Sequence, residues 1–197
     1  MSKEVEFYFD VGSPTSYLAF TQLRKICEET GATLIYRPML LGGVFKATGN
    51  ASPNEVPAKA RYSITDLARF AERYDVPLVF NPHFPINTLN LMRAITAVQS
   101  IEPQRFLAFL ELTFKAMWID ALDLNDPAVL AAALKKGGFD PAQVLGWVND
   151  PQVKDGLKSA TEAAVARGIF GAPSMFVGDQ LYFGQDRVDF VRDALNA

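Results

Sequence analysis

The feature that most constrains the fold is a change of hydrophobic period along the chain. Residues 4–11 (EVEFYFDV) place every second side chain, all apolar, on one face, which is typical of a strand. Residues 14–30 predict a helix that ends at Gly31, and residues 32–38 predict a second strand. The N-terminal part therefore predicts a parallel β-α-β unit with a right-handed crossover.

The rest of the chain changes period twice more. From about residue 40 to 167, apolar side chains recur at helical spacing between Pro and Gly breakers. Residues 174–177 and 180–183 then predict two strands joined by a Gly178-Asp179 hairpin turn, and a last helix begins near Asp186. The order β-α-β, helical block, β-β-α is that of a thioredoxin fold with a helical insertion.

We therefore expect an α/β chain made of two domains. Residues 1–45 and 168–197 would form the thioredoxin-like domain, with one sheet built from both ends of the chain. Residues 46–167 would form an all-helical insertion domain that covers one edge of this sheet.

The composition excludes several kinds of chemistry. Cys27 is the only cysteine and His83 the only histidine, so the chain has no CxxC redox pair, no Cys/His zinc cluster and no GxSxG-type Ser-His-Asp triad. The net charge of −3 gives no reason to expect a nucleic-acid partner. No N-terminal signal pattern and no apolar run of about 18 residues is present, so we expect a cytoplasmic protein without a membrane partner.

The turn that enters the first helix is the first candidate site. In the segment FDVGSPTSY (residues 9–17), Ser13 and Ser16 occupy the two positions that a CxxC pair takes in a thioredoxin-like protein. Ser13 can be read simply as a helix N-cap followed by Pro14. The two readings are compatible, because a capping hydroxyl can also donate outward where the helix N-terminus favours an anion.

Two C-terminal segments complete the candidate site. Pro173 lies just before a predicted strand, where thioredoxin-like proteins have a cis proline beside the reactive site, so we expect a cis Ala172-Pro173 bond. The segment from Phe183 to Arg187 enters the last helix, where Asp186 is alternatively a simple cap.

Taken together, these motifs resemble a known family. SPTSYLA (residues 13–19), Gly49-Asn50, GAP (171–173) and GQDR (184–187) are similar, in this order, to the glutathione-binding branch of the DsbA-like superfamily. That branch contains the kappa-class glutathione transferases and the 2-hydroxychromene-2-carboxylate isomerases. The resemblance spans nearly the whole chain and implies a DsbA-like fold, glutathione as the cofactor and a homodimer.

The resemblance also implies a role for each motif. Ser13 would lie against the glutathione sulfur, Ala172 would hydrogen-bond the backbone of the glutathione cysteine, and Asp186 would meet the γ-glutamyl ammonium. The implied glutathione-binding residues are Ser13, Asn50, Ala172, Phe183, Gly184, Gln185 and Asp186. Ser13 has no partner base, so we expect it to stabilise the glutathione thiolate rather than to act as a nucleophile.

Three residues are candidates for the substrate. Lys46, with Asn50, would bind the substrate carboxylate, and Phe84 would stack on an aromatic ring. The alternatives are a solvent-exposed lysine and ordinary core packing of the phenylalanine.

Three functions remain open at this stage. The first is a glutathione-dependent isomerase that interconverts 2-hydroxychromene-2-carboxylate and trans-o-hydroxybenzylidenepyruvate in naphthalene-type aromatic catabolism. The second is a kappa-type transferase that conjugates small electrophiles, and the third is a non-catalytic thioredoxin-fold binding protein. The compact length and the segment around Lys46 resemble the bacterial isomerases, which favours the first.

Overall fold

The computed structural model describes residues 3–197 and is built around one mixed sheet. Its strands are β1 (Glu4–Phe9), β2 (Thr33–Pro38), β3 (Ser174–Val177) and β4 (Gln180–Phe183), in the order β2-β1-β3-β4. β1 pairs with β2 in parallel and with β3 antiparallel, with Phe7 opposite Met175. The two ends of the chain therefore share one sheet, as the change of period predicts.

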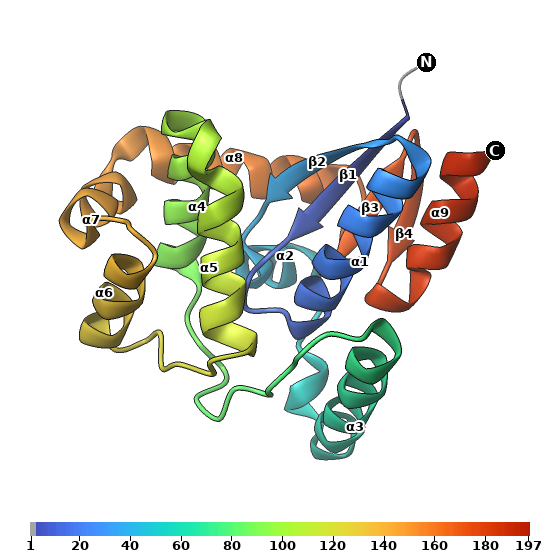
Figure 1. Cartoon of the computed structure of the whole chain (residues 1–197), viewed down its shortest axis with the longest axis horizontal. Coiled ribbons are helices and arrows are strands. Elements are labelled where there is room, and N and C mark those ends of the chain that lie inside the picture. Colours follow the sequence, from blue (N-terminus) through green and yellow to red (C-terminus); the bar gives the residue numbers. More distant parts are fainter. Residues whose placement is uncertain (1–2) are drawn as a thin grey trace.

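Helices cover both faces of this sheet. α1 (Pro14–Thr30) and α9 (Val188–Asn196) lie side by side on one face (Figure 1). α2 (Leu41–Thr48) and α8 (Pro151–Ala166) pack against the other, where a small apolar cluster is buried. That cluster comprises Tyr8, Met39, Val44, Ala164, Ile169 and Phe176.

Apart from α8, the helical insertion falls into two groups. α4 (Leu89–Ile101), α5 (Phe106–Trp118), α6 (Pro127–Lys136) and α7 (Pro141–Asn149) gather at the left of Figure 1, whereas α3 (Pro57–Tyr74) lies apart from them, below α1. Short 3-10 helices form at Pro53–Glu55 (η1), Pro103–Arg105 (η2) and Gln185–Arg187 (η3). The predicted domain boundary after residue 45 falls inside α2, so the two-domain division stays a prediction.

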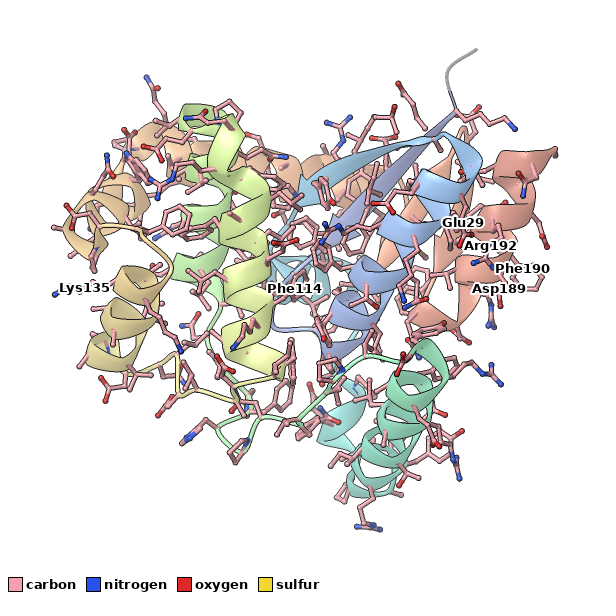
Figure 2. All side chains as sticks on the ribbon, viewed as in Figure 1. Glu29, Phe114, Lys135, Asp189, Phe190 and Arg192 are labelled. Atoms are coloured by element: carbon pink, nitrogen blue, oxygen red, sulfur yellow. The ribbon has the colours of Figure 1, made fainter. Side chains whose placement is uncertain are left out.

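The insertion and the sheet share one apolar core. Phe114 of α5, at the centre of Figure 2, has its ring 6.0 Å from that of Phe9 in β1 and 5.0 Å from that of Phe20 in α1. Trp118, at the end of α5, is fully buried, and its Nε1–H donates to the Val11 carbonyl oxygen at 2.8 Å. These contacts hold the loop after β1 in place from the insertion side.

The ends of the elements follow local signals, with small corrections. Ser13 caps α1, and Gly31 ends it with a φ of 67°. β1 stops at Phe9 rather than at the predicted residue 11, because the Asp10 carbonyl oxygen accepts the Ser13 N–H at 3.0 Å and turns the chain. The last helix is entered through η3, so its α-helical part begins at Val188 rather than near Asp186.

Neither a metal-binding cluster nor a membrane-spanning helix occurs among the described residues. Among residues 3–197, no group of three or more His, Cys, Asp and Glu side chains could hold a metal ion. Over the same range, every helix is too short or too polar to cross a membrane.

Candidate active site

A cavity of about 410 Å³ opens at the N-terminal end of α1. Its wall is formed by the start of α1, by α2, by η1 and α3, and by the segments on either side of the β3-β4 hairpin. Seven of the predicted ligand-contacting residues line it together with Phe84, the predicted aromatic wall. They are Ser13, Asn50, Ala172, Phe183, Gly184, Gln185 and Asp186.

Ser13 lines this cavity and is only 5% exposed. Its Oγ accepts the Ser16 N–H at 3.1 Å, which makes it the cap of α1. The free N–H groups of the first helical turn give this end of α1 a partial positive charge. The two interpretations of Ser13, as a cap and as a site residue, are thus compatible, because the capping residue also lines the cavity.

The Ser13 hydroxyl shares its surroundings with two other oxygens. Its Oγ lies 2.8 Å from the Thr15 Oγ1, and both hydroxyls lie 3.2 Å from the Ala172 carbonyl oxygen. The Ala172-Pro173 bond is cis, as predicted. The β3 segment therefore brings a carbonyl oxygen against the start of α1, across more than 150 residues of sequence.

The segment before α9 is held by backbone contacts. The Gly184 N–H donates to the Pro173 carbonyl oxygen at 3.0 Å, and the Tyr74 hydroxyl of α3 donates to the Gln185 carbonyl oxygen at 2.7 Å. Burial raises the pKa of Tyr74 to about 12, so this hydroxyl stays protonated as a donor. Asp186 pairs with its neighbour Arg187 at the cavity wall.

The backbone conformation favours glycine at position 184, and a side chain there would also displace the Asp186 carboxylate. The φ of Gly184 is 100°, which side chains rarely adopt, and a Cβ there would lie 2.5 Å from Asp186 Oδ1. The glycine therefore allows the Asp186 carboxylate to fold back over the backbone beside the cavity.

Asn50 is fixed by a long-range contact. Its Nδ2 donates to the Phe170 carbonyl oxygen at 2.8 Å, and its Oδ1 accepts the Ala51 N–H at 2.8 Å. The Phe170 ring in turn lies 4.6 Å from that of Phe183. Asn50 thus joins the loop after α2 to the cis-proline segment.

An aromatic wall closes another side of the cavity. Phe80 and Phe84 both line it, with ring centroids 5.4 Å apart, and each packs against the buried Trp118. The Phe84-Pro85 bond is also cis, which the sequence analysis did not predict.

Lys46 does not join this site. It lines a separate hollow between α2, α4 and α8, together with Arg93 and Lys154. Leu41 and Phe45 are the α2 side chains that reach the cavity. The expectation that Lys46 meets a substrate carboxylate is therefore not supported by its position, since the helix turns this side chain away.

The charged groups of the cavity wall are few. Within residues 3–197, its carboxylates are Asp66 and Asp186 and its one cation is Arg187, which is already paired with Asp186. A negatively charged ligand would have to compete for Arg187 or rely on amide and hydroxyl donors.

Asp10 supports the site from outside the cavity, and the sequence analysis did not single it out. It is 1% exposed, and its carboxylate accepts the N–H of Gly12 at 2.9 Å, the N–H of Leu41 at 2.8 Å and the hydroxyl of Thr88 at 3.1 Å. Burial raises the pKa of this carboxyl, although the three donors partly offset the effect. Its position offers one signal that could have found it: an acidic residue between the apolar end of a strand and a Gly-Ser-Pro turn.

Asp10 ties together the elements that carry the site. Gly12 precedes Ser13, Leu41 begins α2 and Thr88 precedes α4. The N-cap residue of α2, Leu40, has no side-chain oxygen, so Asp10 supplies the acceptor from a different element.

Comparisons with known proteins agree with this architecture. The model of the DSBA-like thioredoxin domain family matches residues 4–196. The 2-hydroxychromene-2-carboxylate isomerase of Sphingobium xenophagum is 34% identical over 197 residues, which cover 99% of each chain. Human glutathione S-transferase kappa 1 is 30% identical, and the match covers 99% of this chain and 92% of the human protein.

Solved structures extend the comparison. A 2-hydroxychromene-2-carboxylate isomerase structure aligns with a TM-score of 0.86 at 30% identity and covers 98% of this chain and 94% of its own. The probable DsbA oxidoreductase from Streptomyces coelicolor aligns at 18% identity with a TM-score of 0.76, over 98% of this chain and 88% of its own, and shows the shared fold alone. Since the family match spans nearly the whole chain, the protein belongs to the DSBA-like thioredoxin domain family.

Proposed function

We propose that this protein is a glutathione-dependent isomerase that interconverts 2-hydroxychromene-2-carboxylate and trans-o-hydroxybenzylidenepyruvate in naphthalene-type aromatic catabolism, acting as a homodimer in the cytoplasm. One observation carries the proposal: a serine, rather than a cysteine, lines the cavity at the start of α1. The only cysteine, Cys27, is buried elsewhere on α1. A thiol for the reaction must therefore come from a bound ligand.

The residues of the cavity fit glutathione. Its volume of about 410 Å³ lies within the range of small-molecule sites, roughly 300–1,000 Å³. Ser13 and the start of α1 suit a thiolate, and Asp186 suits an ammonium. The side-chain oxygen of Asn54, also in the wall, is buried and has no hydrogen-bond partner within residues 3–197, so it suits a ligand N–H group.

The protein's own groups supply binding and electrostatics. Held by Ser13 and the start of α1, glutathione would supply a thiolate nucleophile for reversible addition to a conjugated carbon, with elimination after bond rotation returning the double bond and the thiol. Ser13 donates its hydroxyl hydrogen bond to the sulfur, and the N-terminus of α1 favours the negative charge, so the thiol ionises without an imidazole. Phe80 and Phe84 offer apolar faces to an aromatic ring. Asn50 offers its second amide N–H to charge that develops on substrate oxygen.

A kappa-type transferase is the second candidate, and the charge of the cavity favours it. Because the only cation of the wall within the described chain is paired with Asp186, the site has no free positive group for a carboxylate substrate. An uncharged electrophile would not need one. The two candidates differ in whether glutathione is recovered at the end of the reaction.

The test is to incubate the protein with a 2-hydroxychromene-2-carboxylate, with and without glutathione, while following the ultraviolet spectrum and the free thiol. Isomerisation that requires glutathione and consumes none supports the proposal. Stoichiometric loss of the thiol into a conjugate supports the transferase, and binding without turnover supports the non-catalytic alternative. Activity that does not depend on glutathione rejects all three.

A matched pair of variants assigns the chemistry to Ser13. Ser13→Ala is expected to lower turnover and to raise the pKa of the bound thiol more than it weakens glutathione binding. Ser16→Ala removes a neighbouring buried hydroxyl that has no hydrogen-bond partner within residues 3–197, so it is expected to retain wild-type turnover. Equal effects of the two substitutions would contradict the assignment.

A further inference from the structure

The Ser13 hydroxyl has one proton and two neighbouring oxygens that could accept it, the Ala172 carbonyl oxygen and the Thr15 hydroxyl oxygen. Two hydroxyl groups, on Ser13 and Thr15, surround one acceptor, the Ala172 carbonyl oxygen, at equal distances of 3.2 Å. The two hydroxyl oxygens are themselves 2.8 Å apart, so one donates to the other. The group therefore has two protons to share, and either hydroxyl can satisfy the carbonyl.

Two arrangements of these protons are consistent with the distances. In one, Ser13 donates to Ala172 and Thr15 donates to Ser13; in the other, Thr15 donates to Ala172 and Ser13 donates to Thr15. The oxygen of Ser13 accepts the Ser16 N–H in both. A ligand sulfur adds a further acceptor, and only the Ser13 proton is required to move to it.

Thr15 has no other task that the structure shows. Its hydroxyl bonds only to Ser13 and Ala172 within residues 3–197, and the cap of the α1 backbone is provided by Ser13 instead. Thr15 is half-buried and lines the cavity next to Ser13.

We propose that Thr15 is a positioning residue: its hydroxyl holds the Ala172 carbonyl oxygen when the Ser13 hydroxyl donates to the glutathione sulfur, and so leaves the Ser13 proton free for that bond. The inference rests on the proposed use of glutathione. Without Thr15, the Ala172 carbonyl oxygen and the sulfur compete for the single Ser13 proton, so one of the two loses a hydrogen bond.

The test uses three variants and two ligands. Thr15→Val keeps the side-chain shape without the hydroxyl, Thr15→Ser restores the hydroxyl, and Thr21→Val is the matched control. Thr21 is on the same helix but donates to Leu18, away from the cavity. The ligands are glutathione and S-methylglutathione, which has no ionisable thiol.

The main readout is binding, not turnover. Ultraviolet titration of the thiolate measures the pKa of bound glutathione, and calorimetry measures both affinities at pH 8. Thr15→Val is expected to raise the bound thiol's pKa by about 0.5–1 unit and to weaken glutathione about 3- to 10-fold, the effect of one ordinary hydrogen bond. Its affinity for S-methylglutathione is expected to stay within about twofold of wild type, because no thiolate is involved.

Rescue by Thr15→Ser distinguishes a positioning role of the Thr15 hydroxyl from a merely structural role of the side chain. Thr15→Ser is expected to return the thiol pKa to the wild-type value, and Thr21→Val to leave it unchanged. A Thr15→Val protein with the wild-type thiol pKa, or one that loses both ligands equally, overturns the proposal while the use of glutathione stands. If wild-type protein binds neither ligand, the proposed function and this inference are both rejected.

Discussion

Replacing Asp10 by asparagine tests the group that holds the site together. Asparagine has nearly the same shape, but it offers one acceptor oxygen where the carboxylate offers two. In the structure, Oδ1 accepts from Gly12, and Oδ2 accepts from Leu41 and Thr88. Whichever way the amide is oriented, at least one backbone N–H then faces an NH₂ group and loses its acceptor.

The loss of one backbone acceptor sets the expected change in the free energy of unfolding. A buried donor left without a partner costs about 1–3 kcal/mol, and the Thr88 hydroxyl can rotate to accept rather than donate. Asp10→Asn is therefore expected to lower the free energy of unfolding by about 1–3 kcal/mol, which shifts a urea midpoint by about 0.5–1.5 M at a typical m-value. Thr88→Val is the matched control, expected to cost about 1 kcal/mol since both backbone donors keep their acceptor.

The pH dependence separates burial from hydrogen bonding. Burial raises the pKa of Asp10 above its ordinary 3.8, so the folded chain binds this proton more tightly than the unfolded chain. Its contribution to stability is fully present below about pH 3.8 and is lost as the pH rises through the folded pKa. Asparagine does not titrate, so the stability gap between wild type and Asp10→Asn should narrow as the pH rises through that window.

The assay is urea unfolding of both proteins from about pH 3.8 up to about pH 8, with the m-value as a check that the transition is unchanged. A gap that widens with rising pH would mean that the three donors outweigh burial and that the folded pKa is lowered. No loss of stability at any pH would refute the view that Asp10 anchors Gly12 and Leu41.

Three further predictions concern single side chains. Burial raises the pKa of the Cys27 thiol to about 11, from an ordinary value of 9.0. Its thiolate fraction at pH 8 is therefore roughly 100-fold lower than that of a free cysteine, so a disulfide reagent should modify Cys27 slowly until the chain is unfolded. Gly184→Ala should destabilise the fold by about 1–3 kcal/mol and weaken glutathione binding in calorimetry, whereas Gly178→Ala, also at positive φ but clear of neighbours, should affect stability alone. Lys46→Ala should leave kcat and KM within about twofold of wild type in steady-state assays, because the Lys46 side chain lines a different hollow. If Lys46 donated a hydrogen bond to the substrate, its loss would change these constants by more than about twofold.

The elements that local signals define were predictable from the sequence. The predicted and observed bounds of the two hairpin strands, 174–177 and 180–183, agree residue for residue. Both signals are local: Gly178 adopts the positive φ of the turn, and the flanking residues have strand-like patterns. α1 likewise begins after Ser13 and ends before Gly31, where the cap and the left-handed residue are both local. The cis Ala172-Pro173 bond came from the family resemblance rather than from any local pattern.

Features made by distant residues were not predictable in this way. The partners of Asp10 come from residues 12, 41 and 88, and no spacing in the sequence relates those positions. The same holds for Tyr74 and Gln185, which are 111 residues apart. The contacts of Ser13 and Thr15 with the Ala172 carbonyl oxygen could not be predicted either, because they depend on where the segment before β3 lies in the fold.

The position of Lys46 shows how such a distant contact affects the polarity of the cavity wall. A helix turns by about 100° per residue, so neighbouring side chains on α2 face different surroundings. Asp10 holds the N–H of Leu41 and so fixes where this helix starts, which sends Leu41 and Phe45 to the cavity. Lys46 follows Gly43 to the side of α8 instead. The α2 part of the wall is therefore apolar, and the charge of the cavity is left to the start of α1, to Asp66 and to the Asp186-Arg187 pair.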